Sequence, residues 1–502
     1  MTNKQKVTQS VTMIAVFTLI SKFLGFIREV LIASKYGSGY KTDTYFVAMT
    51  ATVMLMTTIG ASLNTTLIPI FTEIEEKKGR IGKLKFLNNI LNVVFLITLI
   101  LALLGFFLSP LVIKILAKGF TGEQFDLAVR LNRIGLPIVI FLGFTYVFSG
   151  YLHSSQVFGP PAIMGIPYNF VFIFFLIFLG NKGNINHLMI ASVIAASTQF
   201  LIQVPAIIHQ GYRYSLNVNL RDRYLKKALL LVIPVMIGSA VQQINTIVDK
   251  TLASSLVSGS ISALTYASRI NDLIISVFVM AITTVVFPML SKAFSQDDQA
   301  QIKSIMGRGI NIILLITVPA TIGILILAEP MVKLFFQRGA FDELATSMTS
   351  EALIFYSVGL IGSALRLMLN RVYYSFQDTK TPMINGALAV GLNIILNLIL
   401  IKPMGHSGLA LATSISAIFT TALLFIGLRK RLGPIGLTSY LSSFFKTLFA
   451  SIIMGVLVYG IFYGLTPKLP DYRIVEPIML LLSIGVGAIL YFLLCFILKV
   501  EK

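Results

Sequence analysis

The sequence predicts an all-α integral membrane protein with about fourteen transmembrane helices. Of its 502 residues, 56% are hydrophobic and only 12% are charged, whereas a soluble chain carries about 25% charged residues. Apolar stretches of about 20 residues, the length needed to cross a bilayer as a helix, recur along the whole chain. Lysine and arginine gather in alternate connections between these stretches, as the positive-inside rule describes for cytoplasmic loops.

Each expected span is an apolar stretch that ends at glycine, proline or charge. In chain order the spans cover residues 11–35, 43–71, 86–116, 125–152, 158–180, 187–210, 228–254, 260–290, 305–328, 345–376, 381–401, 406–428, 441–464 and 475–498. Basic loops are expected at 75–85 and 213–227. These loops and the basic residues near the N-terminus fall on one side of the membrane, so both termini are expected in the cytoplasm.

Composition and missing motifs favour transport over catalysis. The net charge of +20 fits basic cytoplasmic loops facing acidic lipid headgroups, and no nucleic-acid partner is expected. A single cysteine, Cys495, excludes an internal disulfide, and no cleavable signal is evident. Nucleotide-binding, serine-hydrolase and zinc-protease motifs are absent from the sequence. A membrane glycosyltransferase, the alternative from another class, would need carboxylates in a large outer loop, and the outer loops here are short.

An internal repeat is visible in the sequence. A shift of 220 residues lays Ile27–Ser34 over Ile247–Ser254, and a shift of 222 sets Tyr151 on Tyr373. Six helices fit in one repeat, and an even number preserves direction across the membrane, so parallel repeats are expected with the substrate path between them. The predicted organisation is an N-lobe at 1–212, a C-lobe at 213–431 and a C-terminal helix pair at 432–502.

Charged residues inside the spans are the main functional signal, because each one costs roughly 2.5–3.5 kcal/mol near the centre of a membrane helix. They are Lys22, Arg28, Glu29 and Asp43 in the first half, and Asp249, Lys250, Arg269, Asp272, Arg366 and Arg371 in the second. One interpretation is local neutralisation, with Glu29 beside Arg28 or Lys22 and Asp272 three residues after Arg269. The other is an anion site, since cations outnumber carboxylates and arginine suits phosphate oxygens.

A second group of polar residues combines Asp249, Asn393, Asn397 and Thr413. The two asparagines are four residues apart and share one helix face. Carboxylate, amide and hydroxyl oxygens suit a hard cation such as Na⁺. Interhelical hydrogen bonding is the alternative. No other cofactor is expected.

Several segments, taken together and in order, resemble one known family. They are Ser21-Lys22-x-Leu24-Gly25-Phe26-x-Arg28-Glu29, Gly37-x-Gly39-x-x-x-Asp43-x-Tyr45-Phe46, Gln243–Asp249, Tyr266–Ile270, Phe336–Asp342, Arg371–Pro382 and Gly408–Ser414. This set resembles the MurJ (MviN) family of lipid II flippases, in the multidrug/oligosaccharidyl-lipid/polysaccharide exporter superfamily. The matches extend over nearly the whole chain.

The resemblance implies two six-helix lobes, a final helix pair associated with a lipid-tail groove, and a cationic cavity that holds the lipid II headgroup during alternating access. By matching position, the substrate-binding residues are Lys22, Arg28, Glu29, Asp43 and Arg269. The expected function is translocation of undecaprenyl-pyrophosphate-linked peptidoglycan precursor across a bacterial cytoplasmic membrane, by a chain that acts as a monomer among membrane lipids. The alternatives are a flippase for another polyprenyl-linked oligosaccharide and a cation-coupled drug exporter.

Two positions depart from the family pattern. Lys22 stands where relatives usually carry arginine, which keeps the charge and loses the bidentate fork. Residues 53–58 contain no cation, although many relatives carry an arginine pair there. The second helix is therefore a weaker candidate for pyrophosphate binding than the first.

Overall fold

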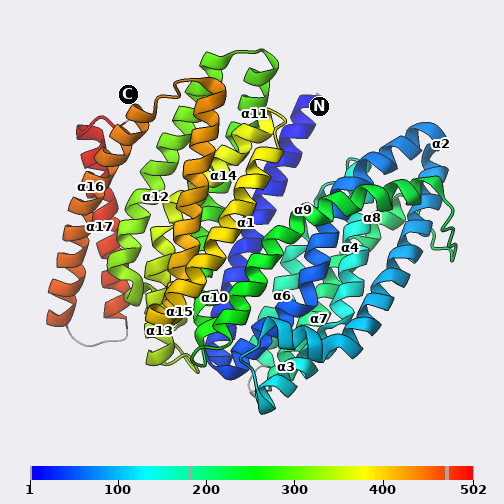
Figure 1. The fold of residues 1–502 in the computed structure, drawn as a ribbon, viewed down its shortest axis with the longest axis horizontal. Coiled ribbons are helices and arrows are strands. Elements are labelled where there is room, and N and C mark those ends of the chain that lie inside the picture. Colours follow the sequence, from blue (N-terminus) through cyan, green and yellow to red (C-terminus); the bar gives the residue numbers. More distant parts are fainter. Residues whose placement is uncertain (1–2, 180–183, 470–473, 501–502) are drawn as a thin grey trace. The chain divides into compact units, whose positions relative to one another are not determined.

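The computed structural model describes residues 3–179, 184–469 and 474–500, and within these ranges every regular element is a helix (Figure 1). The helices are α1 (Asn3–Tyr36), α2 (Tyr40–Leu116), α3 (Gly122–Gly135), α4 (Pro137–Ser154), α5 (Gly159–Ile163), α6 (Gly165–Phe178), α7 (Ile185–Leu201), α8 (Val204–His209), α9 (Arg223–Ala253), α10 (Ser260–Ile274), the π-helix η2 (Ile275–Val279), α11 (Met280–Ser295), α12 (Gln299–Phe336), α13 (Glu343–Val358), α14 (Leu360–Ser375), α15 (Lys380–Leu432), α16 (Leu437–Leu465), the 3₁₀-helix η3 (Thr466–Lys468) and α17 (Val475–Ile497). The all-α prediction is confirmed.

The helices are long and apolar enough for a protein that crosses the membrane many times. Among the described residues, nine helical stretches could span a bilayer, or ten with the bent pair α13 and α14. Helices α2 and α15 contain 77 and 53 residues, which is about 115 and 80 Å at 1.5 Å per residue. Each exceeds the hydrocarbon core of about 30 Å and has room for two crossings. The count of fourteen stays a prediction.

Two glycines divide these long helices. Gly79 in α2 has φ +65° and Gly405 in α15 has φ +56°, a left-handed conformation that glycine adopts without a steric cost. The prediction of a loop at 75–85 is therefore wrong, because the chain stays helical on both sides of Gly79.

Ion pairing and hydrogen bonding of Lys83 explain why this basic stretch packs against the rest of the chain. The buried Lys83 ammonium donates to the Glu75 carboxylate at 2.6 Å and to the Ser155 hydroxyl at 2.8 Å.

The chain forms two compact units, residues 1–261 and residues 262–502. In unit 1, α2 packs against α3, α4 and α9. In unit 2, α12 packs against α13, α14 and the C-terminal helices α16 and α17. Met454, Val458 and Leu480 contribute to the core of this last group, and the Tyr491 hydroxyl donates to the Leu315 carbonyl at 2.9 Å. The lobe boundaries at 212 and 431 stay predictions.

The predicted repeat is visible in the backbone. Gln156 after α4 and Gln377 after α14 both have φ +58°, and they are 221 residues apart. Left-handed glycines recur at nearly the same offset, in the pairs Gly37 and Gly259, and Gly211 and Gly433. Left-handed residues end helices or allow sharp turns, so the two halves break their helices at corresponding places.

Candidate functional site

The Arg28 guanidinium is held by two oxygen acceptors in unit 1. Arg28 lies on α1, and its Nη2 donates to Glu29 Oε1 at 2.8 Å. Its Nη1 donates to Asn169 Oδ1, on α6, at 3.0 Å. The Glu29 side chain is 4% exposed and that of Arg28 is 18% exposed. The local neutralisation proposed for Glu29 is therefore present, and Arg28 is fixed in direction while part of it stays accessible.

Asn169 positions this arginine because its amide is itself anchored. Asn169 Nδ2 donates to the Ser21 carbonyl on α1 at 3.0 Å and to the Gly165 carbonyl on α6 at 2.8 Å. One side chain thus joins α1 to α6 and leaves its oxygen for Arg28. Sequence reasoning missed Asn169; the available signal was an amide in the otherwise apolar and aromatic run of α6.

Aromatic rings complete the surroundings of Arg28. The guanidinium carbon lies 5.4 Å from the Tyr168 ring centroid and 5.2 Å from that of Phe172. A cation over an aromatic face at this distance is attracted by about 0.5–2 kcal/mol, and more when water is excluded. Lys22, six residues earlier on the same helix, is exposed. Of the two predicted substrate-binding cations on α1, Arg28 is therefore fixed and Lys22 is exposed.

Asp43 has a structural contact in addition to its predicted role. Its carboxylate is buried and accepts the Gly259 N–H at 2.7 Å. The Ser38 hydroxyl donates to the carbonyl of the same glycine at 3.1 Å. These bonds join the start of α2 to the connection between α9 and α10, all within unit 1. In this conformation Asp43 holds two connections together.

Arg269 lies on α10 in unit 2 and has a different environment. Its side chain is 45% exposed and its Nη1 lies 3.7 Å from Asp272 Oδ2. The pairing expected from the three-residue spacing is therefore present, at a length that favours an ion pair over a hydrogen bond. The π-helix η2 begins at Ile275, less than one turn after Asp272. Single π-turns inside α-helices occur frequently at functional sites.

Three of the four residues of the predicted Na⁺ site lie together in unit 2. Asn397 Nδ2 donates to Asn393 Oδ1 at 2.9 Å, and Asn393 Nδ2 donates to Thr413 Oγ1 at 3.4 Å across the two arms of α15. Asp249, in unit 1, accepts from Asn245 Nδ2 at 3.1 Å. The three α15 side chains are joined in the interhelical hydrogen bonding that was the alternative interpretation. A Na⁺ site at Asp249, Asn393, Asn397 and Thr413 stays a prediction.

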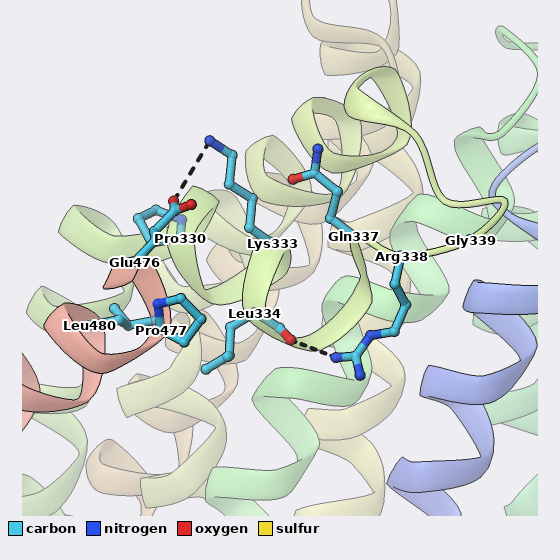
Figure 2. A pocket seen from close by; sticks show the side chains of 9 residues that line it. All are labelled: Pro330, Lys333, Leu334, Gln337, Arg338, Gly339, Glu476, Pro477 and Leu480. Atoms are coloured by element: carbon cyan, nitrogen blue, oxygen red, sulfur yellow. Dashed lines mark hydrogen bonds and ion pairs between the residues drawn. The ribbon is translucent and has the colours of Figure 1, made fainter. Parts of the chain in front are cut away.

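Unit 2 also contains a pocket of about 660 Å³ at the end of α12 (Figure 2). Its lining comprises Pro330, Lys333, Leu334, Gln337, Arg338, Gly339, Glu476, Pro477 and Leu480. Lys333 and Glu476 point toward one another at 3.9 Å, and Lys333 also contacts Glu329 at 3.1 Å. Arg338 turns back to donate to the Leu334 carbonyl at 2.6 Å. Lys333 is thus engaged by carboxylates and Arg338 by a backbone carbonyl, so the pocket joins α17 to α12.

The fold is shared with multi-span membrane transporters of known structure. An inward-facing multidrug resistance MATE transporter of the MOP superfamily aligns with a TM-score of 0.70 and 15% identity, over 85% of this chain and 99% of that one. A solved structure described as lipid II flippase MurJ, inward closed conformation, aligns with a TM-score of 0.79 and 27% identity, over 96% of this chain and 98% of that one. The likeness to the MATE transporter, at 15% identity, concerns the fold alone.

The family follows from the sequence comparisons. A family model described as lipid II flippase MurJ matches residues 32–469. The probable lipid II flippase MurJ of Rickettsia prowazekii is 30% identical over 97% of both chains. The lipid II flippase MurJ of Burkholderia cenocepacia is 29% identical over 83% of this chain and 82% of its own length. The chain belongs to the MurJ family.

Proposed function

We propose that this protein is a lipid II flippase, which moves the undecaprenyl-pyrophosphate-linked peptidoglycan precursor from the inner to the outer leaflet of the bacterial cytoplasmic membrane. Membership of the MurJ family over residues 32–469 is the observation that carries the proposal. The relatives from two organisms share this description over most of their length. The Arg28 environment adds a chemical reason, since an accessible guanidinium within a predicted membrane span is suited to an anionic headgroup.

The mechanism that fits these residues begins with binding of the pyrophosphate. Arg28 has two of its N–H groups engaged by Glu29 and Asn169, and a guanidinium has five in all. The others can contact phosphate oxygens without breaking the internal bonds. Lys22 and Arg269 add charge, and Glu29 limits the positive charge of the empty site. Asp43 keeps the connections at one end of unit 1 in place.

Transport then requires the headgroup to become exposed on the opposite side, while the prenyl chain stays in lipid. Moving one charge through the membrane potential is worth about 2.3 kcal/mol per 100 mV. An anionic headgroup that leaves an inside-negative cell moves downhill in this field, so the translocation step itself needs no nucleotide. The basic connections favour a cytoplasmic location for both termini, under the positive-inside rule.

The direct test is a bacterial strain whose own lipid II flippase is depleted and which depends on this protein. When expression of this protein is shut off, lipid II accessible on the outer face of the membrane should fall while total lipid II rises. Unchanged outer-face lipid II together with loss of another polyprenyl-linked glycan would contradict the proposal and favour the alternative flippase. Unchanged levels of all such lipids would favour a drug exporter.

A further inference from the structure

The connection between α8 and α9 runs beside α2 (Figure 1). Three asparagines of α2 hold it there. Asn88, Asn89 and Asn92 are buried and lie in the first turns of the predicted third span. Their amide nitrogens donate to the carbonyls of Arg213, Ser215, Asn217 and Asn219, each at 3.0 Å. In return, the Ser215 backbone N–H donates to Asn88 Oδ1 at 3.0 Å, and the Asn219 backbone N–H donates to Asn89 Oδ1 at 2.7 Å. Residues 213–219 are therefore fixed in place without belonging to a helix.

This fixed segment exposes an unusual row of apolar side chains. The carbonyls of residues 213, 215, 217 and 219 are bound to α2, and apolar side chains that alternate with them are exposed. Leu216 is 82% exposed, Val218 is 42% exposed and Leu220 is 65% exposed. Such a row, clamped beside the start of a membrane span, is suited to the boundary between lipid headgroups and hydrocarbon.

A groove of about 580 Å³ lies next to the segment in unit 1. Its lining is Leu91, Asn92, Phe95, Phe144, Phe148, Phe200, Val204, Ile207, Ile208, Tyr212 and Tyr214. Tyr212 directly precedes the segment and Tyr214 belongs to it, and their hydroxyls donate to Asn88 Oδ1 at 2.8 Å and to Asn92 Oδ1 at 3.0 Å. The groove is thus mostly aromatic and aliphatic, with polar groups only along the edge that the segment forms.

Positive charge is concentrated along the same edge. Residues 210–227 contain five cations and one acid, Asp222. The Asp222 carboxylate is engaged as the cap of α9, where it accepts the N–H groups of Tyr224 and Leu225 at 2.8 and 3.0 Å. Arg213, between the two groove tyrosines, is exposed, as is Arg221. An anionic group at the mouth of the groove would therefore meet guanidinium groups and no competing free carboxylate from this segment.

We propose that the groove, the clamped segment 213–219 and the adjoining Leu220 and Arg221 form a binding site for an acidic phospholipid. One acyl chain occupies the aromatic groove, the exposed leucines rest among neighbouring chains, and the phosphate contacts Arg213 and Arg221. The groove lining includes none of the Arg28 contacts described above, and the lipid is distinct from the transport substrate. The location of this lipid site in the cytoplasmic leaflet rests on the membrane orientation given in the proposed function. Binding of the lipid to the site does not depend on that orientation.

Lipid retention by the purified full-length protein tests the proposal. After removal of native lipid, bound phosphatidylglycerol and phosphatidylcholine are counted by native mass spectrometry across a titration. The triple variant Arg213→Gln/Arg221→Gln/Arg223→Gln should bind phosphatidylglycerol about tenfold more weakly, because each basic residue near a membrane surface contributes appreciably to acidic-lipid binding. The matched control Arg308→Gln/Arg429→Gln/Lys430→Gln removes as many exposed cations from unit 2 and should bind as the unmodified protein does.

A second variant tests the groove without changing charge. Ile208→Trp alters a lip residue that is 58% exposed, so folding should tolerate it, while the larger ring blocks the acyl chain. It should lower phosphatidylglycerol binding several-fold and leave the flippase function intact. Equal binding by the unmodified protein and the triple variant would overturn the proposal. So would an equal loss in the unit 2 control, because binding would then depend on total charge alone. Neither result bears on lipid II transport.

Discussion

The surroundings of Arg28 and Arg269 differ, although the two arginines are the candidate anion ligands of the two halves. Arg28 has a buried carboxylate neighbour, an anchored amide acceptor and two aromatic rings. Arg269 has an exposed carboxylate one turn away and a π-helix shortly after it. The first arrangement fixes a guanidinium before substrate arrives. The second leaves a half-exposed guanidinium that is able to change partners.

Glu29→Ala should have the largest effect on stability in this comparison. The substitution leaves the Arg28 guanidinium, which is mostly buried, without its carboxylate neighbour. Removing one partner of a buried ion pair costs about 3–5 kcal/mol. Thermal and chemical unfolding of the purified protein measure the change. A loss below about 1 kcal/mol, the range of exposed pairs, would show that the Arg28 environment is no more fixed than that of Arg269.

Asn169→Leu should have the next largest effect. The apolar side chain cannot accept from Arg28 or donate to the Ser21 carbonyl, and an unsatisfied buried group costs about 1–3 kcal/mol. The same unfolding measurements apply. Asn186→Leu, near the start of α7, provides a matched control that should change stability by less than about 0.5 kcal/mol. If both leucine variants behave alike, Asn169 is not the anchor described above.

Asp272→Asn should change stability little, by about 0–1 kcal/mol, because its pair with Arg269 is exposed to solvent. Any contribution should shrink further at high salt, since salt screens exposed charges. Unfolding at low and high ionic strength measures both points. A loss as large as that of Glu29→Ala would remove the contrast between the two arginines.

The smallest expected effect is on the acid stability of one turn in the second half. The Thr381 backbone N–H, at 2.9 Å, lowers the pKa of the Asp378 carboxyl below its ordinary value of 3.8, and the Thr381 hydroxyl and Arg431 act in the same direction. A lowered pKa in the folded state stabilises the protein above the unfolded-state pKa, and this stability is lost as the pH falls through the folded-state pKa.

Asp378→Asn should therefore flatten the decline of stability below about pH 4, as followed by unfolding across an acid series. The corresponding turn of the first half carries Val157 after the left-handed Gln156. Val157→Thr should leave the acid profile unchanged. An Asp378→Asn profile that matches the unmodified protein would mean that this carboxylate does not stabilise the turn.

Much of the fold follows from the sequence because a bilayer imposes a length and an apolar character on every span. The repeat was also predictable, and the left-handed residues Gln156 and Gln377 now mark it in the backbone. The pair Arg269 and Asp272 followed from a three-residue spacing on one helix. Contacts of this kind can be predicted from the sequence, because the helix itself brings residues three or four positions apart next to one another.

Contacts between distant segments were not predictable in the same way. Asn169 lies 141 residues from Arg28, and Gly259 lies 216 residues from Asp43. No local period connects such pairs, so a single asparagine in an aromatic run and a glycine in a connection give no sign of their partners. The helical state of residues 75–85 was missed for a related reason, because Lys83 is stabilised by Ser155, 72 residues away.

The most direct test of the central claim compares Arg28→Ala, Arg28→Lys and Arg371→Ala in the strain that depends on this protein. Lipid II on the outer face and membrane levels of each variant are measured together. Arg371, over the Phe287 ring in unit 2, is a cation outside the predicted substrate set and serves as the control. We predict that Arg28→Ala abolishes lipid II exposure at normal membrane levels, Arg28→Lys retains part of it, and Arg371→Ala retains most. Normal lipid II exposure and growth with Arg28→Ala would contradict the assignment of Arg28 to pyrophosphate binding.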